Sequence, residues 1–229
     1  MSFFRTISKI NSDYHINNVK LVEIDTYQDL GVVFQPNLLF SSNIKYLCSK
    51  ALRSLGFLIR NTKEFNNETC LKILYTSLVR PILEFSSVLW NPAQVGLVES
   101  LERVQRKFLR FVGYKRKLNG HLNPSVAMSL SSIQASINLE SLATRRKSID
   151  IRFMIKLING VISCPDLLNS LNFNVPKYNS RHRPTFSIPF HRTSYGYNNP
   201  LDRIARECNE LNNFDLFHSL DFQPLSKVS

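Results

Sequence analysis

The sequence lacks the motifs that mark most enzymes. It contains no GxGxxG or Walker-type phosphate loop, no GxSxG nucleophile elbow and no HExxH metal-binding helix. No two aspartates are adjacent, so the usual acidic dyad that holds two metal ions for nucleotidyl transfer is missing. We therefore expect this chain by itself to contribute no catalytic residue, no cofactor and no metal ion.

Cysteine is scarce and dispersed. The four cysteines are Cys48, Cys70, Cys164 and Cys208, and none of them forms a Cys-x-x-Cys pair. A metal held by the last two with His182 and His191 is a weak alternative, because the gaps are long and irregular. The simplest interpretation is a reduced, intracellular protein, either nuclear or cytoplasmic.

Long hydrophobic runs are also absent. No apolar stretch approaches the ~20 residues that a membrane-spanning helix needs. The first 15 residues include Phe3 and Phe4 but no apolar segment long enough for a secretory signal. We expect no membrane partner.

Negative charge is under-represented. The chain has 29 lysines and arginines against 17 aspartates and glutamates, a net charge of +12, and a pI of about 9.7. Residues 41–120 carry fourteen basic and five acidic side chains, so most of the excess lies there. Such a balance indicates a polyanionic partner, most often nucleic acid and sometimes a membrane surface. A protein with an ordinary basic surface is the alternative.

The hydrophobic pattern predicts a mainly α protein with a small N-terminal β meander. Residues 14–34 are rich in Val, Ile, Tyr and Phe, and Asn17-Asn18 can supply a turn between strands. Apolar residues at steps of three and four predict helices further along. We expect these helices over 41–65, with Ser41 or Ser42 as N-cap, 66–90, with Asn67 as N-cap, 97–117, 137–161 and about 200–212.

The stretch YTSLVRPILEFSSVLWNP, residues 75–92, combines a helical pattern with a proline. Pro81 has no N–H to give the carbonyl of Ser77, so we expect a kink in the helix there. The spacing predicts that one apolar face contains Tyr75, Leu78, Ile82, Phe85 and Leu89.

The clearest candidate for binding is a row of cations on the predicted helix 97–117. Arg103, Arg106, Lys107 and Arg110 recur at i, i+3, i+4 and i+7, opposite the apolar side. This arrangement suits phosphate contact, which requires charge and reach more than a sequence code. A solvated face balanced by Glu99 and Glu102 is the alternative.

Further cations extend or flank this row. Lys115, Arg116 and Lys117 continue it beyond Gly113, and we rank Lys45, Arg53 and Arg60 of helix 41–65 lower. The RRK sequence at 145–147 is a second, weaker patch, of a kind that is more often a solvated helix end.

Several stretches together resemble a known family. They are DLGVVFQPNLLFSSNIKYLCSKALRSLGFLIRN, LKILYTSLVRPILEFSSVLWNP, ESLERVQRKFLRF, LESLATRRKSIDIRFMIKLINGVISCPDLL and PFHRTSYGYNNPLDRIARECNELNNFDLF. Over roughly residue 14 to the end, the chain resembles the C-terminal part of reverse transcriptases of non-LTR (LINE-type, jockey-like) retrotransposons. The combination of LYxSLVRPxLE, the following WxP and ExVQRKFLR is the specific part.

The resemblance implies an architecture of three segments. Residues 1–40 would be a remnant of the last palm strands, with QDLG at 28–31 at the primer-grip position. Residues 41–118 would form the helical thumb-like bundle, and residues 119–229 a partly irregular C-terminal region with further helices. Pro81, Glu84 and Trp90 would be structural, since the kink would let Glu84 and Trp90 pack back on the bundle.

The resemblance also implies a function and its limit. The family is an RNA-directed DNA polymerase that uses Mg²⁺, but its catalytic aspartates, fingers and most of its palm would lie before residue 1. We therefore expect a truncated, catalytically inactive fragment that contacts the backbone of an RNA–DNA hybrid or DNA with low sequence specificity. The missing palm and fingers of a full-length polymerase would be a further partner. The alternatives are a non-catalytic protein-interaction fragment and a non-functional remnant of the element.

Overall fold

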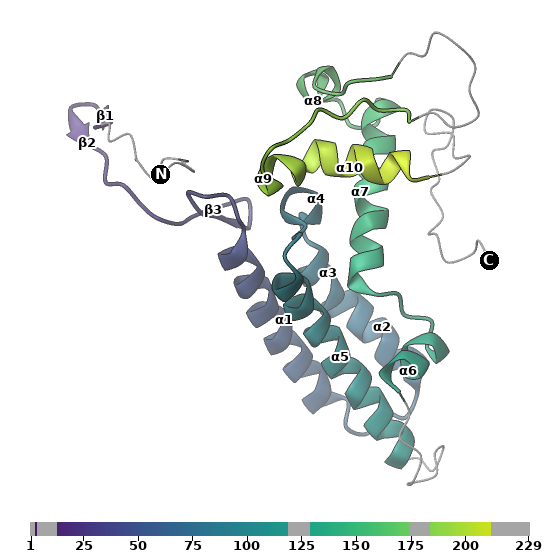
Figure 1. Cartoon of the computed structure of the whole chain (residues 1–229). Coiled ribbons are helices and arrows are strands. Elements are labelled where there is room, and N and C mark those ends of the chain that lie inside the picture. The colour runs from purple at the N-terminus through teal and green to yellow at the C-terminus, as the bar shows by residue number, and fades with distance from the viewer. Residues whose placement is uncertain (1–2, 4–12, 119–128, 175–183, 212–229) are drawn as a thin grey trace. The chain divides into compact units, whose positions relative to one another are not determined.

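The computed structural model describes residues 3, 13–118, 129–174 and 184–211. Within them the protein is mainly helical, with short antiparallel strands near the N-terminus, which confirms the predicted fold class (Figure 1). The helices are α1 (Ser41–Asn61), α2 (Glu68–Leu78), α3 (Arg80–Glu84), α4 (Ser87–Trp90), α5 (Val95–Leu118), α6 (Leu130–Ser136), α7 (Leu142–Ile158), α8 (Pro165–Asn169), α9 (Ser194–Tyr197) and α10 (Pro200–Asn209).

The chain forms two compact units. The first unit comprises residues 1–86 and 94–138, and the second comprises residues 87–93 and 139–229. This division differs from the expected segments 1–40, 41–118 and 119–229. The strand at residues 32–34 packs on α1, α6 packs on α5, and α4 packs on α7. Long-range contacts of this kind are not visible in the periodicity of single segments.

Two β-hairpins precede the helices in the first unit. Strands β1 (His15–Ile16) and β2 (Val19–Lys20) pair through a turn at Asn17 and Asn18, as predicted. Both turn residues have positive φ, which asparagine tolerates well. Strands β3 (Tyr27–Asp29) and β4 (Val32–Phe34) pair in the register Tyr27 to Phe34.

The turn between β3 and β4 lies against Phe85, the residue that follows α3. Gly31 lies in this turn with φ of +84°, and a Cβ added to it would lie 3.1 Å from Cε1 of Phe85. Phe85 follows α3 directly, and the next residue, Ser86, also has positive φ. The break after α3 therefore presents Phe85 to the β3–β4 hairpin.

Replacing Gly31 by alanine is expected to lower the free energy of unfolding by about 1–2 kcal/mol. The new methyl group would be strained at φ of +84° and crowded against Phe85. Thermal unfolding followed by circular dichroism measures the loss. Gly96→Ala is the matched control, because nothing lies within 4 Å of its added Cβ inside α5 and alanine favours a helix. Equal stabilities of the two variants would contradict this prediction.

Helix α1 is capped differently from the expectation that Ser41 or Ser42 is the N-cap. The N-cap is Phe40, with φ of 55° and no side-chain cap. The side-chain oxygen of Gln35 accepts hydrogen bonds from the Ser42 N–H at 2.9 Å and from the Ser41 hydroxyl at 3.1 Å. A residue from the preceding loop thus satisfies donors of the first helical turn.

The predicted single helix over 66–90 is wrong in two respects. The segment forms three helices, α2, α3 and α4, and Pro81 lies in the first turn of α3, where its missing N–H costs no hydrogen bond. The predicted apolar face is also wrong at three positions: Tyr75 is buried as predicted, but Leu78, Phe85 and Leu89 are exposed. The buried side chains are Leu71, Tyr75, Val79 and Leu83. The cap was predicted correctly: the Asn67 side chain accepts hydrogen bonds from the amides of Thr69 and Cys70.

Helices α1, α2 and α5 enclose the core of the first unit. Its centre is a stacked pair, Tyr75 and Phe108, with ring centroids 4.2 Å apart and an interplanar angle of 10°. Both side chains are fully buried, and the Tyr75 hydroxyl donates to Oε1 of buried Gln105 at 3.1 Å. The phenol therefore gains a partner for its polar end while its ring contributes to the core.

The second unit is built on α7 and α10. Its apolar core includes Ile151, Met154, Ile155, Phe186 and Ile204. Ser141 caps α7 by accepting from the Thr144 amide, and the helix is shorter than the predicted 137–161. The predicted final helix, about 200–212, appears as α10 over 200–209.

A buried polar network joins α4 to α7 and α10 inside the second unit. Asp150 is fully buried and accepts from Asn91 Nδ2 at 2.9 Å, and Arg203 Nη2 lies 3.2 Å from its Oδ2. The same guanidinium donates to the Val88 carbonyl at 2.7 Å, while Arg146 Nε donates to Asn91 Oδ1 at 3.0 Å. Through these contacts, two arginines and a carboxylate hold the short helix α4.

Candidate nucleic-acid interface

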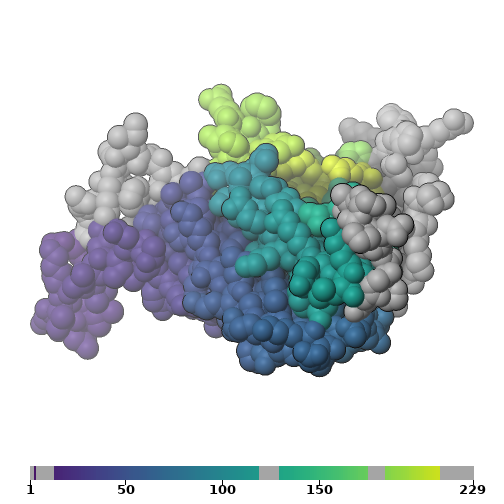
Figure 2. Space-filling view, turned by 90° about the horizontal axis from the view of Figure 1, so that it is seen from below, coloured from purple at the N-terminus to yellow at the C-terminus, as the bar shows by residue number. Residues whose placement is uncertain are grey.

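Helices α1 and α5 lie side by side and run in the same direction. The Cys48 thiol near the start of α1 donates to the Ser100 carbonyl at 3.6 Å, and Lys115 near the end of α5 donates to the carbonyl of Lys63, just past the end of α1. Both contacts join residues 52 positions apart, so the two helices keep one parallel register. Figure 2 shows their atoms next to each other on one face of the molecule.

The outer side of α5 carries most of the predicted cations. Arg103, Lys107, Arg110 and Lys117 are all exposed, as is Tyr114. At about 100° per residue these five positions lie within one arc, opposite buried Leu101, Phe108 and Val112. This part of the predicted row is therefore available to a ligand.

Helix α1 provides a second set of exposed cations. Lys45, Arg53 and Arg60, which we ranked lower from the sequence, are all exposed, and so is Lys50. Residues 41–61 contain no acidic side chain, so nothing within α1 balances these charges. From these exposed cations we define the α1–α5 surface as six of them, without Lys50 and Lys117: Lys45, Arg53, Arg60, Arg103, Lys107 and Arg110.

Two predicted phosphate contacts are instead used inside the protein. Lys115 is only 4% exposed, and its ammonium group donates to the Lys63 carbonyl. Arg116 forms a two-pronged ion pair with Glu68, with both N–O distances at 2.6 Å, and also donates to Ser136 at 2.7 Å. The Glu68 carboxylate raises the pKa of Arg116 above its usual value. These two cations hold α5 to neighbouring parts of the first unit. Because their charges are used there, they are not part of the proposed interface.

Arg106 has a partly satisfied charge. Its guanidinium forms an ion pair with the carboxylate of Glu99, two turns earlier on the same helix. The hydrogen bond from Arg106 lowers the pKa of Glu99, as expected for a carboxylate beside a cation. A phosphate would have to compete with Glu99 for this guanidinium, so Arg106 is a weaker candidate than its neighbours.

The RRK patch at 145–147 is not a free basic surface. Arg145 lies 3.6 Å from Glu140, and Lys147 donates to Glu210 at 2.5 Å. Arg146 is 1% exposed within the network around Asn91. This patch serves the internal structure of the second unit.

The three predicted structural residues have different surroundings. Pro81 is the second residue of α3, and Glu84 lies 3.8 Å from Arg80 within the same short helix. Trp90 is 2% exposed, but it belongs to the second unit, since α4 packs on α7. The expectation that Trp90 packs back on the helical bundle is thus wrong, because the chain leaves the first unit after Ser86 and returns at Gln94.

The cations of α1, ranked below those of α5 from the sequence, are exposed as well. The informative signal was the complete absence of Asp and Glu over 41–61, which distinguishes α1 from a balanced solvated face. Lys115 and Arg116 were predicted to continue the row of cations on α5. Their partners, Lys63 and Glu68, lie about 50 residues earlier in the chain, so local spacing gave no indication of them.

Neither a metal site nor a membrane span is found in the described part of the chain. Over residues 13–118, 129–174 and 184–211, no group of three His, Cys, Asp or Glu side chains is placed to hold a metal ion. His182, considered above as a metal ligand, lies outside the described residues. Among the described helices, none is both long and apolar enough to cross a membrane.

Comparison with known proteins gives no match: no family model, no curated protein and no solved structure is similar to this chain.

Proposed function

We propose that the α1–α5 surface binds the phosphate backbone of an RNA–DNA hybrid or a DNA duplex without reading its sequence. The supporting observation is that six exposed cations lie on two parallel, neighbouring helices, one of which has no acidic residue. Backbone contact requires charge at the end of flexible side chains and no fixed pattern of donors and acceptors. The charge of the whole chain, +12, adds long-range attraction for a polyanion.

The length of the surface suits several phosphates of one strand. Lys45 to Arg60 spans 15 residue steps of α1, about 22 Å at a rise of 1.5 Å per residue. A strand of B-form duplex advances about 3.4 Å along the duplex axis per phosphate while it winds around that axis, so a straight surface of this length meets several phosphates before the strand turns away.

Our inference about origin agrees with this role. The motifs quoted above resemble the C-terminal part of a non-LTR retrotransposon reverse transcriptase, in which the thumb contacts the primer–template duplex. We propose that this chain is such a fragment and adds no nucleotides by itself. An incorporation assay with Mg²⁺, primer–template and the purified chain is expected to give no extension.

Reversing two charges on the surface is expected to weaken binding and its dependence on salt. If all six cations contact phosphates, the wild-type affinity for a labelled hybrid falls about a thousandfold from 50 to 200 mM salt. Arg103→Glu/Lys107→Glu loses at least two phosphate contacts. Its affinity for the hybrid should therefore fall only about a hundredfold between 50 and 200 mM salt. Fluorescence anisotropy across a salt series measures both slopes.

The matched control is Arg152→Glu/Lys156→Glu on α7. It makes the same change of charge at the same i, i+4 spacing, at two exposed positions of the second unit. The control should retain most of the wild-type slope. If both variants reduce the slope equally, binding depends on total charge, and the α1–α5 surface is not the site.

A second candidate function is supported by the N-terminal hairpins. Ile16, Val19, Val22 and Leu30 are between 60% and 89% exposed, an unusual density of apolar surface for so short a segment. Such a surface suits a protein partner. Capture of a partner that resists nuclease and high salt, and that is lost in Val19→Ser/Val22→Ser, would support this function over nucleic-acid binding.

A further inference from the structure

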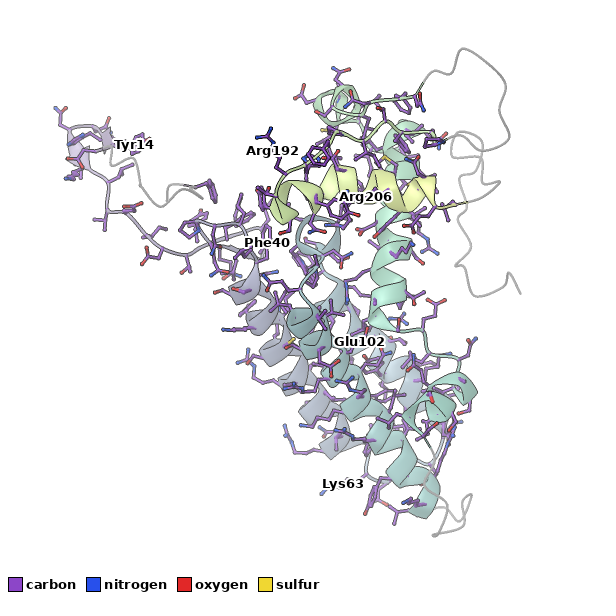
Figure 3. All side chains as sticks on the ribbon, in the orientation of Figure 1. Tyr14, Phe40, Lys63, Glu102, Arg192 and Arg206 are labelled. Carbon is purple, nitrogen blue, oxygen red and sulfur yellow. The ribbon has the colours of Figure 1, made fainter. Side chains whose placement is uncertain are left out.

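A short segment of the second unit exposes aromatic rings beside cations. We call Phe190, Arg192, Tyr195 and Tyr197 the aromatic loop. Phe190 is 89% exposed, Tyr197 is 52% exposed and Tyr195 is 36% exposed. Arg192 is also exposed, and Figure 3 shows its side chain extending away from the ribbon. Residues 189–199 contain no aspartate or glutamate.

The loop is held in one conformation by contacts on both sides of α9. Thr193 Oγ1 accepts from the Gly196 amide at 3.1 Å and so caps this short helix. His191 Nε2 lies 2.7 Å from Asp202 Oδ2 on α10, which ties the start of the loop to that helix. A Cβ on Gly196 would lie only 2.8 Å from His191 Nδ1, so the ring packs directly on the backbone.

The end of the loop is fixed by a stacked arginine. The guanidinium of Arg206 lies 3.5 Å from the centroid of the Tyr197 ring, and the same side chain donates to the Tyr197 carbonyl. Figure 3 shows Arg206 on α10, which supports the loop. The exposed rings therefore belong to an ordered surface, and a ligand would not have to organise it first.

Burial of the Phe190 side chain would be favourable, but the fold leaves this side chain 89% exposed to water. The nearby carboxylate of Asp202 is held by His191 at 2.7 Å and by Asn199 at 3.4 Å, contacts that fix its position on α10. Flat exposed rings beside an exposed cation are a combination that binds single strands, because bases stack on aromatic rings and arginine contacts phosphate.

We propose that the aromatic loop binds unpaired bases of single-stranded RNA or DNA by stacking, with Arg192 contacting the backbone. This site is different in chemistry from the α1–α5 surface. The α1–α5 cations would track any phosphate backbone, whereas the loop requires bases that are free to stack. It does not depend on the function proposed for the first unit.

The test compares two labelled strands with the full chain at one salt concentration. One strand is a 12-nucleotide oligothymidylate, and the other is an abasic 12-mer with the same phosphates. We expect the wild type to bind oligothymidylate about tenfold more tightly, since one stacked base typically contributes that much. In Phe190→Ala/Tyr195→Ala this ratio should fall to about one, while the affinity for the abasic strand stays unchanged.

Further variants separate this site from other effects. Phe190→Leu keeps an apolar side chain without an aromatic ring and should lose most of the preference. Tyr14→Ala/Tyr27→Ala removes two aromatics that are 62% and 52% exposed on the N-terminal hairpins, and should retain the ratio. Arg103→Glu/Lys107→Glu should weaken binding of both strands and leave their ratio unchanged.

A wild-type ratio of one, no binding of oligothymidylate at low salt, or an unchanged ratio in Phe190→Ala/Tyr195→Ala would overturn the proposal. A different result would overturn the function proposed for the α1–α5 surface. In that case the wild type still prefers oligothymidylate, but Arg103→Glu/Lys107→Glu does not change binding of the hybrid.

Discussion

Replacing Arg203 by methionine is expected to lower the free energy of unfolding of the second unit by about 3–5 kcal/mol. Arg203 is 9% exposed, lies 3.2 Å from the Asp150 carboxylate and donates to the Val88 carbonyl at 2.7 Å. Methionine fills similar space but leaves a fully buried carboxylate without its main compensating charge. Trp90, the only tryptophan, is buried in this unit, so its fluorescence during urea unfolding measures the loss.

The effect should depend on pH in a defined direction. Burial raises the pKa of Asp150 to about 6, and burial together with the Asp150 charge raises the pKa of Glu207 to about 7. The folded unit therefore binds more protons than the unfolded chain between about pH 4 and 7, and the free energy of unfolding falls as pH rises through this range. The defect of Arg203→Met should be smaller at pH 5 than at pH 8, because protonation removes the uncompensated charge.

Two further variants test this interpretation. Lys156→Met changes an exposed cation on α7 and should be close to neutral. Asp150→Asn/Arg203→Met removes both charges and should recover part of the stability that Arg203→Met alone loses. A double variant less stable than Arg203→Met would show that the charge of Asp150 is not the cause of the defect.

Replacing Phe108 by alanine is expected to lower the free energy of unfolding of the first unit by about 3–5 kcal/mol. The ring is fully buried and stacks on Tyr75 at 4.2 Å, so the change opens a cavity and removes an aromatic pair. Urea unfolding followed by circular dichroism measures the loss. Phe57→Ala on α1 is the matched control, since Phe57 is 58% exposed and should cost little.

This second prediction also bears on the proposed interface. Phe108 lies on the inner side of α5 and supports the outer side that carries Arg103, Lys107 and Arg110. Binding of a hybrid by Phe108→Ala should therefore weaken in parallel with the fraction of folded first unit. Full binding by a chain shown to be unfolded in this unit would mean that the cations act without a defined helical surface.

Local sequence patterns determined much of the secondary structure. Apolar spacing correctly placed α1 and α5, and their buried rows include Leu47, Leu55, Leu101 and Phe108 as periodicity requires. Turn and cap chemistry correctly placed Asn17-Asn18 and Asn67, because short polar side chains satisfy neighbouring backbone groups. These features depend on residues a few positions apart.

The predicted binding residues differ in their exposure to solvent for the same reason. Charge at regular spacing identified Arg103, Lys107 and Arg110, which the fold leaves exposed. The identical argument included Lys115 and Arg116, whose partners are the Lys63 carbonyl and the Glu68 carboxylate. Whether a cation is free for a ligand depends on groups brought beside it from distant positions.

By itself, the sequence determined that this protein is mainly helical, basic and without a recognisable catalytic motif, because composition and periodicity act locally. Only the tertiary structure decided that 66–90 is three helices, that α4 and Trp90 belong to the second unit, and which cations face solvent. Val79 and Leu83 are buried in place of Leu78 and Phe85 because elements far apart in the chain pack on them. Arg203, paired with Asp150, hydrogen-bonds α4 for the same reason.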